Sequence, residues 1–136
     1  MKNYSFSSYS NNRLINILFL LSAFVIGLGC CRIYISGNLK GIFLVWNLFL
    51  AWIPFIIAFL VSRRLEKISL PTLCICLFVW LLFLPNAPYL ITDLIHLRPR
   101  DGIPLWYDAV IFFLFAFHGL LLGLLSTLFI HEIFEK

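Results

Sequence analysis

Residues 42–61 read IFLVWNLFLAWIPFIIAFLV, twenty residues without one charged side chain. A helix needs about 20 apolar residues to cross a hydrocarbon core of about 30 Å. Three other runs have the same character, at residues 14–31, 68–84 and 109–130. Lipid cannot hydrogen-bond the backbone, so each run must satisfy its own N–H and C=O groups, as a helix does. The sequence therefore predicts an all-α membrane bundle of four transmembrane helices. A β-barrel is excluded because the runs show no alternation of polar and apolar residues.

The composition of the chain excludes most other classes of protein. Of 136 residues, 62% are hydrophobic and only 12% are charged, whereas soluble domains carry about 25% charged residues. So few charges cannot cover a water-soluble particle, and disorder requires low hydrophobicity. The ten basic residues are scattered, whereas nucleic-acid binding needs a basic stripe. We therefore expect a single membrane domain, residues 1–136, with the lipid bilayer around it and no nucleic-acid partner.

The distribution of Lys and Arg predicts the orientation of the chain, because basic residues in short loops stay in the cytoplasm. The densest basic cluster is the hinge at residues 62–67, SRRLEK. With a cytoplasmic N-terminus, six basic residues lie inside and four outside. This pattern favours a protein of the cell (plasma) membrane with both termini in the cytoplasm. The connection formed by residues 85–108 then faces outward.

That connection, PNAPYLITDLIHLRPRDGIPLWYD, is the one long break between spans. Residues 89–97 have a helical pattern with a single polar stripe, formed by Tyr89, Thr92, Asp93, His96 and Arg100. Asn86 is placed to cap this helix, with Pro88 in its first turn. The pattern predicts a short amphipathic helix that lies at the membrane interface.

Asp93 and His96 are the candidate catalytic residues. They sit three positions apart on the stripe, so their side chains can meet. This spacing suits two metal ligands or a carboxylate that orients an imidazole for acid–base work. It also suits a solvated polar face with no chemical role. Asp108, just before the fourth span, is a further candidate metal ligand, although its position favours capping that helix. No cofactor is indicated.

Two polar residues lie inside the apolar runs, Asn47 in the second and His118 near the middle of the fourth. Polar groups at such depth face the bundle and find partners there. With Asn86 and Tyr89 they are the remaining polar candidates, and most of the set falls on the outer side of the membrane. Small residues at Gly119 and Gly123, and at Ala23 and Gly27, predict faces for helix–helix association.

Several strings resemble a bacterial membrane-protein family, the domain of unknown function 1361. They are WLLFLPNAPY at residues 80–89, TDLIHL at 92–97, NLFLAWIP at 47–54 and WYD at 106–108. The resemblance covers roughly residues 42–126. It implies a multi-pass protein of the bacterial inner membrane and transfers no catalytic residue. Family members continue into further helices with another polar motif, so the resemblance also implies that this chain is a shortened form or a fragment.

Three functions remain open from the sequence. The first is a binding or transport component with a polar site that faces outward. The second is a membrane enzyme that acts on a lipid-linked substrate through Asp93 and His96. The third is a structural or assembly subunit that uses its small-residue faces. The sequence does not decide whether the protein is an enzyme.

Overall fold

The computed structural model describes residues 8–37, 39, 41–98 and 103–135. Within these ranges the chain forms five α-helices and two short 3₁₀ helices. They are α1 (Ser8–Ser36), α2 (Ile42–Arg64), η1 (Leu65–Lys67), α3 (Leu70–Phe83), α4 (Asn86–Thr92), η2 (Asp93–His96) and α5 (Leu105–Phe134). Four stretches are long and apolar enough to cross a membrane, namely Asn12–Ser36, Ile42–Lys67, Leu70–His96 and Leu105–Phe134. The prediction of an all-α bundle with four spans is confirmed.

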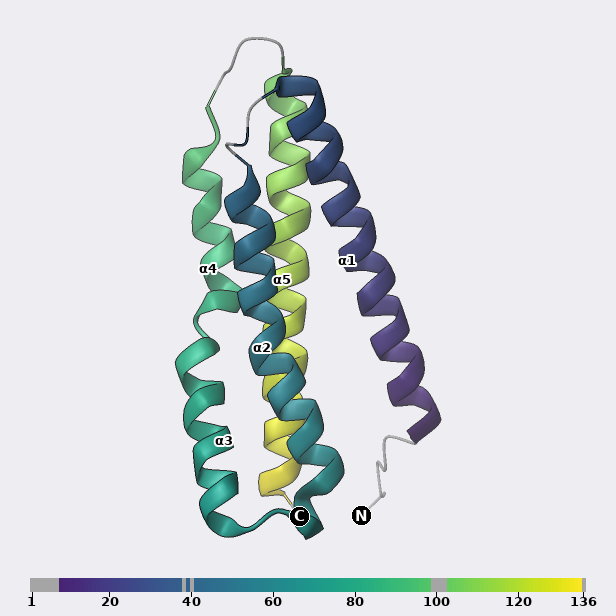
Figure 1. Cartoon of the computed structure of the whole chain (residues 1–136), viewed down its shortest axis with the longest axis vertical. Coiled ribbons are helices and arrows are strands. Elements are labelled where there is room, and N and C mark those ends of the chain that lie inside the picture. Colours follow the sequence, from purple (N-terminus) through teal and green to yellow (C-terminus); the bar gives the residue numbers. More distant parts are fainter. Residues whose placement is uncertain (1–7, 38, 40, 99–102, 136) are drawn as a thin grey trace.

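The helices run along one common long axis, and both termini lie at the same end of the bundle (Figure 1). Helices α2 and α5 form the centre of the bundle, since α2 packs against the other four α-helices and α5 packs against α1, α2 and α4. The turn between α1 and α2 and the segment that enters α5 lie at the opposite end, which we call the loop end. Gly37 ends α1 with a φ of 60°, a left-handed conformation that glycine adopts without a steric cost.

The third span is a broken helix. Helices α3 and α4 lie one above the other in Figure 1 and together follow the length of α5. Pro85 has no backbone N–H and its ring clashes with the preceding helical turn, which ends α3. The Asn86 side chain donates a hydrogen bond of 3.0 Å to the carbonyl of Phe83 and so satisfies one acceptor that the break leaves free. Asn86 therefore bridges the break, and the expected cap of α4 is instead occupied by Pro85.

Glycines on α5 give α4 its place inside the bundle. A Cβ atom added at Gly123 would lie 2.7 Å from the Cβ of Ala87, and one at Gly119 would overlap the Leu90 side chain. Ala87 and Leu90 are fully buried. The structure thus does not confirm an amphipathic helix at the interface, because α4 continues the third span against this small-residue face. The sequence predicted a face for helix–helix association at Gly119 and Gly123. In the structure α4 of the same chain covers both glycines.

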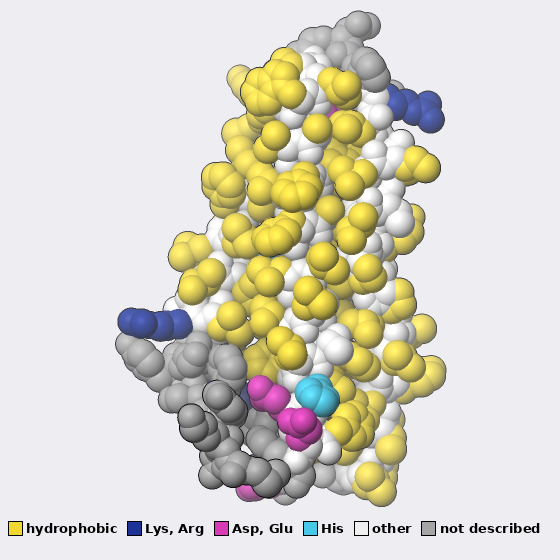
Figure 2. Space-filling view, turned by 180° about the vertical axis from the view of Figure 1, so that it is seen from behind, with side chains coloured by type: hydrophobic (Ala, Val, Ile, Leu, Met, Phe, Trp, Pro, Cys, Tyr) yellow, Lys and Arg dark blue, Asp and Glu magenta, His cyan; other side chains and the backbone are white. Residues whose placement is uncertain are grey.

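The outer surface of the bundle is apolar. Large hydrophobic side chains are exposed on all four spans, and they cover most of the face in Figure 2. The charged side chains visible on that face lie toward its two ends. Such a surface fits contact with lipid tails along the length of the bundle. Ala23 and Gly27 lie on this exposed surface, and association through them stays a prediction.

Candidate functional site

Four polar side chains from four different segments gather near the loop end of the bundle. Arg32 lies in the last turns of α1, Asn47 in the second turn of α2, Asp93 at the start of η2 and Asp108 in the first turn of α5. They form two pairs, and each pair contains a buried carboxylate. The two carboxylates differ in what balances their charge.

Asp108 is paired with an arginine. The Arg32 Nε–Asp108 Oδ1 distance is 2.6 Å and the Nη2–Oδ2 distance is 2.9 Å, so the guanidinium binds both carboxylate oxygens. The two residues are only 1% and 3% exposed. Gly41 leaves room for the arginine, since a Cβ there would lie 2.9 Å from its Nη1. This bidentate geometry is among the strongest forms of ion pair in proteins.

The expectation that Asp108 caps the fourth span is therefore wrong. The cap position of α5 is occupied by Pro104, without a side-chain hydrogen bond to the helix end. Arg32 draws the carboxylate into the bundle instead. Sequence reasoning treated Arg32 only as a loop charge that reports orientation. The signal that sequence reasoning missed was an arginine directly after one apolar run, residues 14–31, and an acid directly before another, residues 109–130.

Asp93 is paired with a neutral amide. Asn47 Nδ2 donates a hydrogen bond of 2.8 Å to Asp93 Oδ2. Asp93 is 3% exposed, so it does not belong to a solvated polar stripe. Among the described residues, no Lys or Arg forms an ion pair with it. Asn47 and Asp93 were both candidates from the sequence, and the structure joins them across 46 positions of the chain.

His96 ends the same 3₁₀ helix that Asp93 begins. Its side chain is exposed, its ring packs edge-on to Phe43 at 5.7 Å, and it follows Asp93 by three positions, one turn of the 3₁₀ helix. Asp108 does not join Asp93 and His96 in a common site, because its carboxylate is bound by Arg32. Within the described residues, no set of three or more His, Cys, Asp or Glu side chains is arranged to hold a metal ion. Tyr89 points outward and is largely exposed.

His118 forms a separate polar centre halfway along α5. Its Nε2 lies 2.7 Å from the Ser22 hydroxyl of α1, and Trp52 Nε1 of α2 donates to the same hydroxyl over 3.0 Å. The imidazole is fully buried, and its Nδ1 has no hydrogen-bond partner among the described residues. The sequence singled out His118 but not Ser22 or Trp52. Their contact ties α1 to α2 and α5 at mid-depth.

A family comparison places most of these residues in a known sequence group. The family described as "Protein of unknown function (DUF1361)" matches residues 46–136. The chain belongs to this family. Neither a curated protein nor a solved structure matches the chain. Asn47, Asp93, Asp108 and His118 lie within the DUF1361 match, whereas α1 with Arg32 and Ser22 lies outside it.

Proposed function

We propose that the protein is a membrane binding or transport component that takes up a proton or a small cation at Asp93. The observation that carries this proposal is the burial of an acidic side chain whose hydrogen-bond partner is a neutral amide. The surrounding bundle is a multi-pass membrane protein by the length and apolarity of its helices.

The two buried carboxylates provide an internal comparison. Both are 3% exposed, yet Arg32 neutralises Asp108, while Asn47, the hydrogen-bond partner of Asp93 among the described residues, carries no charge. An isolated ionised carboxylate is expensive to bury, and such groups become neutral or acquire a partner. Ionisable residues inside membrane spans mark ion and proton sites for the same reason. A bound proton or cation completes the Asp93 site in the way that Arg32 completes the Asp108 pair.

The position of the site suits uptake from one side of the membrane. It lies toward the loop end, while the termini and the hinge with Arg63, Arg64 and Lys67 lie at the other end (Figure 1). We propose that the hinge and both termini are cytoplasmic, because basic residues are retained on that side. The Asp93 site then lies toward the outer surface of the cell membrane.

Thermal unfolding of the purified chain in detergent tests the proposal. A ligand that binds only the folded state stabilises it by an amount that rises with the logarithm of its concentration once the site is mostly occupied. The Tm of the wild type should rise as protons or Na⁺ are added, and Asp93→Asn should remove that dependence. Glu66→Gln is the matched control, since Glu66 is an exposed acid at the hinge. Equal dependence on pH and Na⁺ in all three proteins would refute uptake at Asp93.

A membrane enzyme that acts on a lipid-linked substrate is the second candidate function. It is favoured by the exposed imidazole of His96 beside a buried carboxylate, an arrangement that can orient a general base. The two candidates differ in their need for the imidazole. His96→Ala should leave the Na⁺ and pH dependence of the Tm intact if the protein is a binding component. Loss of that dependence in His96→Ala would favour a site in which both residues act together.

A further inference from the structure

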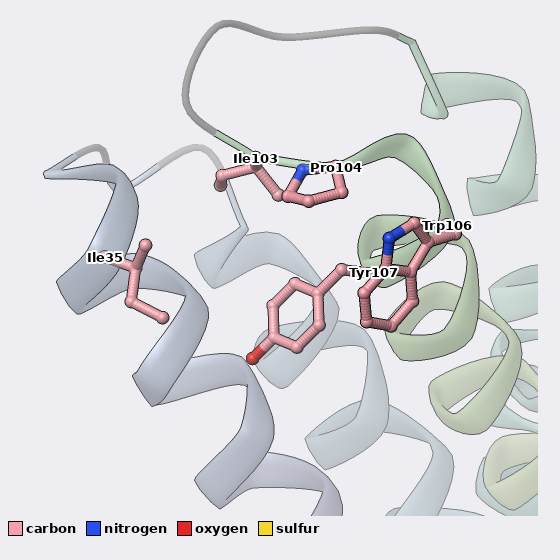
Figure 3. Close-up of a pocket in the computed structure, with 5 residues that line it drawn as sticks. All are labelled: Ile35, Ile103, Pro104, Trp106 and Tyr107. Carbon is pink, nitrogen blue, oxygen red and sulfur yellow. The ribbon is translucent and has the colours of Figure 1, made fainter.

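A second feature of the loop end is an apolar pocket between α1 and the start of α5. Ile35 borders it from α1, Ile103 and Pro104 from the segment that enters α5, and Trp106 and Tyr107 from the first turn of α5. Figure 3 shows Ile35 and Tyr107 on facing sides, with Ile103 and Pro104 beyond them toward the end of the bundle. The pocket has a volume of about 160 Å³.

The chemistry of the pocket is that of a hydrocarbon site. Its lining side chains are aliphatic or aromatic, and almost all of its surface is contributed by carbon. Arg32, on α1 with Ile35, and Asp108, next to Tyr107 in the sequence, are bound to each other and offer nothing to an ionic ligand. An apolar cavity of ~150 Å³ in another protein holds benzene, so this pocket has room for about six carbon atoms. A short length of hydrocarbon chain matches both the size and the lining.

The surroundings of the pocket identify the source of that chain. Ile35 is 64% exposed and Trp106 is 68% exposed, so two walls of the pocket continue into the apolar outer surface of the spans. Trp and Tyr are the residues that gather where lipid tails meet headgroups, because their rings are apolar and their polar tips reach water. A phospholipid beside α1 and α5 brings its acyl chains directly to this opening.

We infer that the pocket holds a segment of one acyl chain of a membrane phospholipid. The lipid is wedged between α1 and α5 at the same depth as the Arg32–Asp108 pair. There it covers apolar surface that the two helices do not bury against each other. The site is independent of Asp93, which packs on the α2 and α4 side of α5.

Photo-crosslinking of the full chain in phospholipid vesicles tests this inference. The probe is a phosphatidylcholine with a photoreactive group on one acyl chain, and mass spectrometry maps the labelled residues. Labelling should concentrate on Ile35, Ile103 and Tyr107 and exceed that of lipid-facing residues elsewhere on α5, such as Phe113 and Phe117. Labelling spread evenly over these exposed side chains would overturn a defined site.

Two variants separate pocket binding from general lipid contact. Ile35→Trp projects a larger ring into the pocket from an exposed helix position, and it should lower labelling of Ile103 and Tyr107 to the level of Phe113. Tyr34→Trp is the matched control, since Tyr34 is a neighbouring exposed residue on α1 that does not line the pocket, and it should label like the wild type. Unchanged labelling in Ile35→Trp would overturn the inference. Asp93→Asn should label normally, so failure here is distinct from failure of the proposed function.

Discussion

The Arg32–Asp108 pair allows a prediction whose size follows from its geometry. Arg32→Met removes both hydrogen bonds, of 2.6 Å and 2.9 Å, from a carboxylate that is almost fully buried. Removing one partner of a buried pair costs about 3–5 kcal/mol, because the other charge is left without compensation. The folded-to-unfolded ratio should therefore fall roughly 100- to 4,000-fold.

The double variant Arg32→Met/Asp108→Leu distinguishes this cause from simple loss of contacts. It removes the buried charge together with its partner, so its stability should return to within about 1 kcal/mol of the wild type or exceed it. The assay is reversible unfolding in mixed micelles, followed by circular dichroism and tryptophan fluorescence. Arg98→Met is the control, since Arg98 is exposed at the same end of the bundle and surface changes stay within about 0.5 kcal/mol.

Two results would refute this reasoning. One is a cost for Arg32→Met no larger than that of the Arg98→Met control, which would mean that the pair behaves like an exposed salt bridge. The other is a double variant that loses at least as much stability as Arg32→Met alone. In that case packing or hydrogen bonding, and not the orphaned charge, would set the cost.

Three further predictions follow from the packing, the buried hydrogen bonds and the charge distribution. Gly123→Ala should destabilise the bundle by about 1–3 kcal/mol through overpacking against α4, whereas Gly27→Ala should not destabilise it, because a Cβ there meets nothing within 4 Å. Equal unfolding midpoints of the two variants would contradict this account of α4. Ser22→Ala should cost about 1–3 kcal/mol in the same unfolding assay, because it leaves a half-buried indole N–H and a buried imidazole nitrogen without their partner. A neutral effect would show that this hydroxyl does not hold α1 against α2 and α5. In a background without native cysteines, a cysteine introduced at Gly102 should react with an impermeant thiol reagent added to intact cells, and a cysteine introduced at Glu66 should not react. The reverse pattern would show that the proposed orientation is wrong.

The four spans were predictable because the length and apolarity of a segment are enough to indicate that it crosses a membrane as a helix. Residues 42–61 have no charge, and lipid enforces a helix on such a run whatever its neighbours do. The sequence placed the end of the third span at residue 84, before Pro85, which cannot continue a helix, and did not predict that the span resumes after this proline. The direction of α4 was not predicted either, because it depends on contacts with distant glycines, Leu90 with Gly119 and Ala87 with Gly123.

The polar residues were likewise predictable only in part. The depth of Asn47 and His118 in apolar runs predicted that each side chain finds a partner within the bundle, and each is hydrogen-bonded to a side chain of another segment. Their partners could not be assigned, since Asn47 bonds across 46 positions to Asp93 and His118 across 96 positions to Ser22. Asp93 was misplaced on a solvated stripe because the helical pattern around it was assumed to lie flat at the interface. Because α4 packs against α2 and α5, Asp93 at its end is buried in the bundle.

Infrared difference spectroscopy of the carboxyl groups tests the central claim most directly. Wild-type protein in lipid vesicles is titrated with acid and then with Na⁺, and Asp93→Asn and Glu66→Gln are treated in parallel. If Asp93 is the uptake site, the wild type and Glu66→Gln should show a protonated carboxyl band that Na⁺ diminishes, and Asp93→Asn should lack it. A spectrum unchanged by Asp93→Asn, or a carboxylate that stays ionised without a response to Na⁺, would contradict the assignment of Asp93 as a proton or cation site.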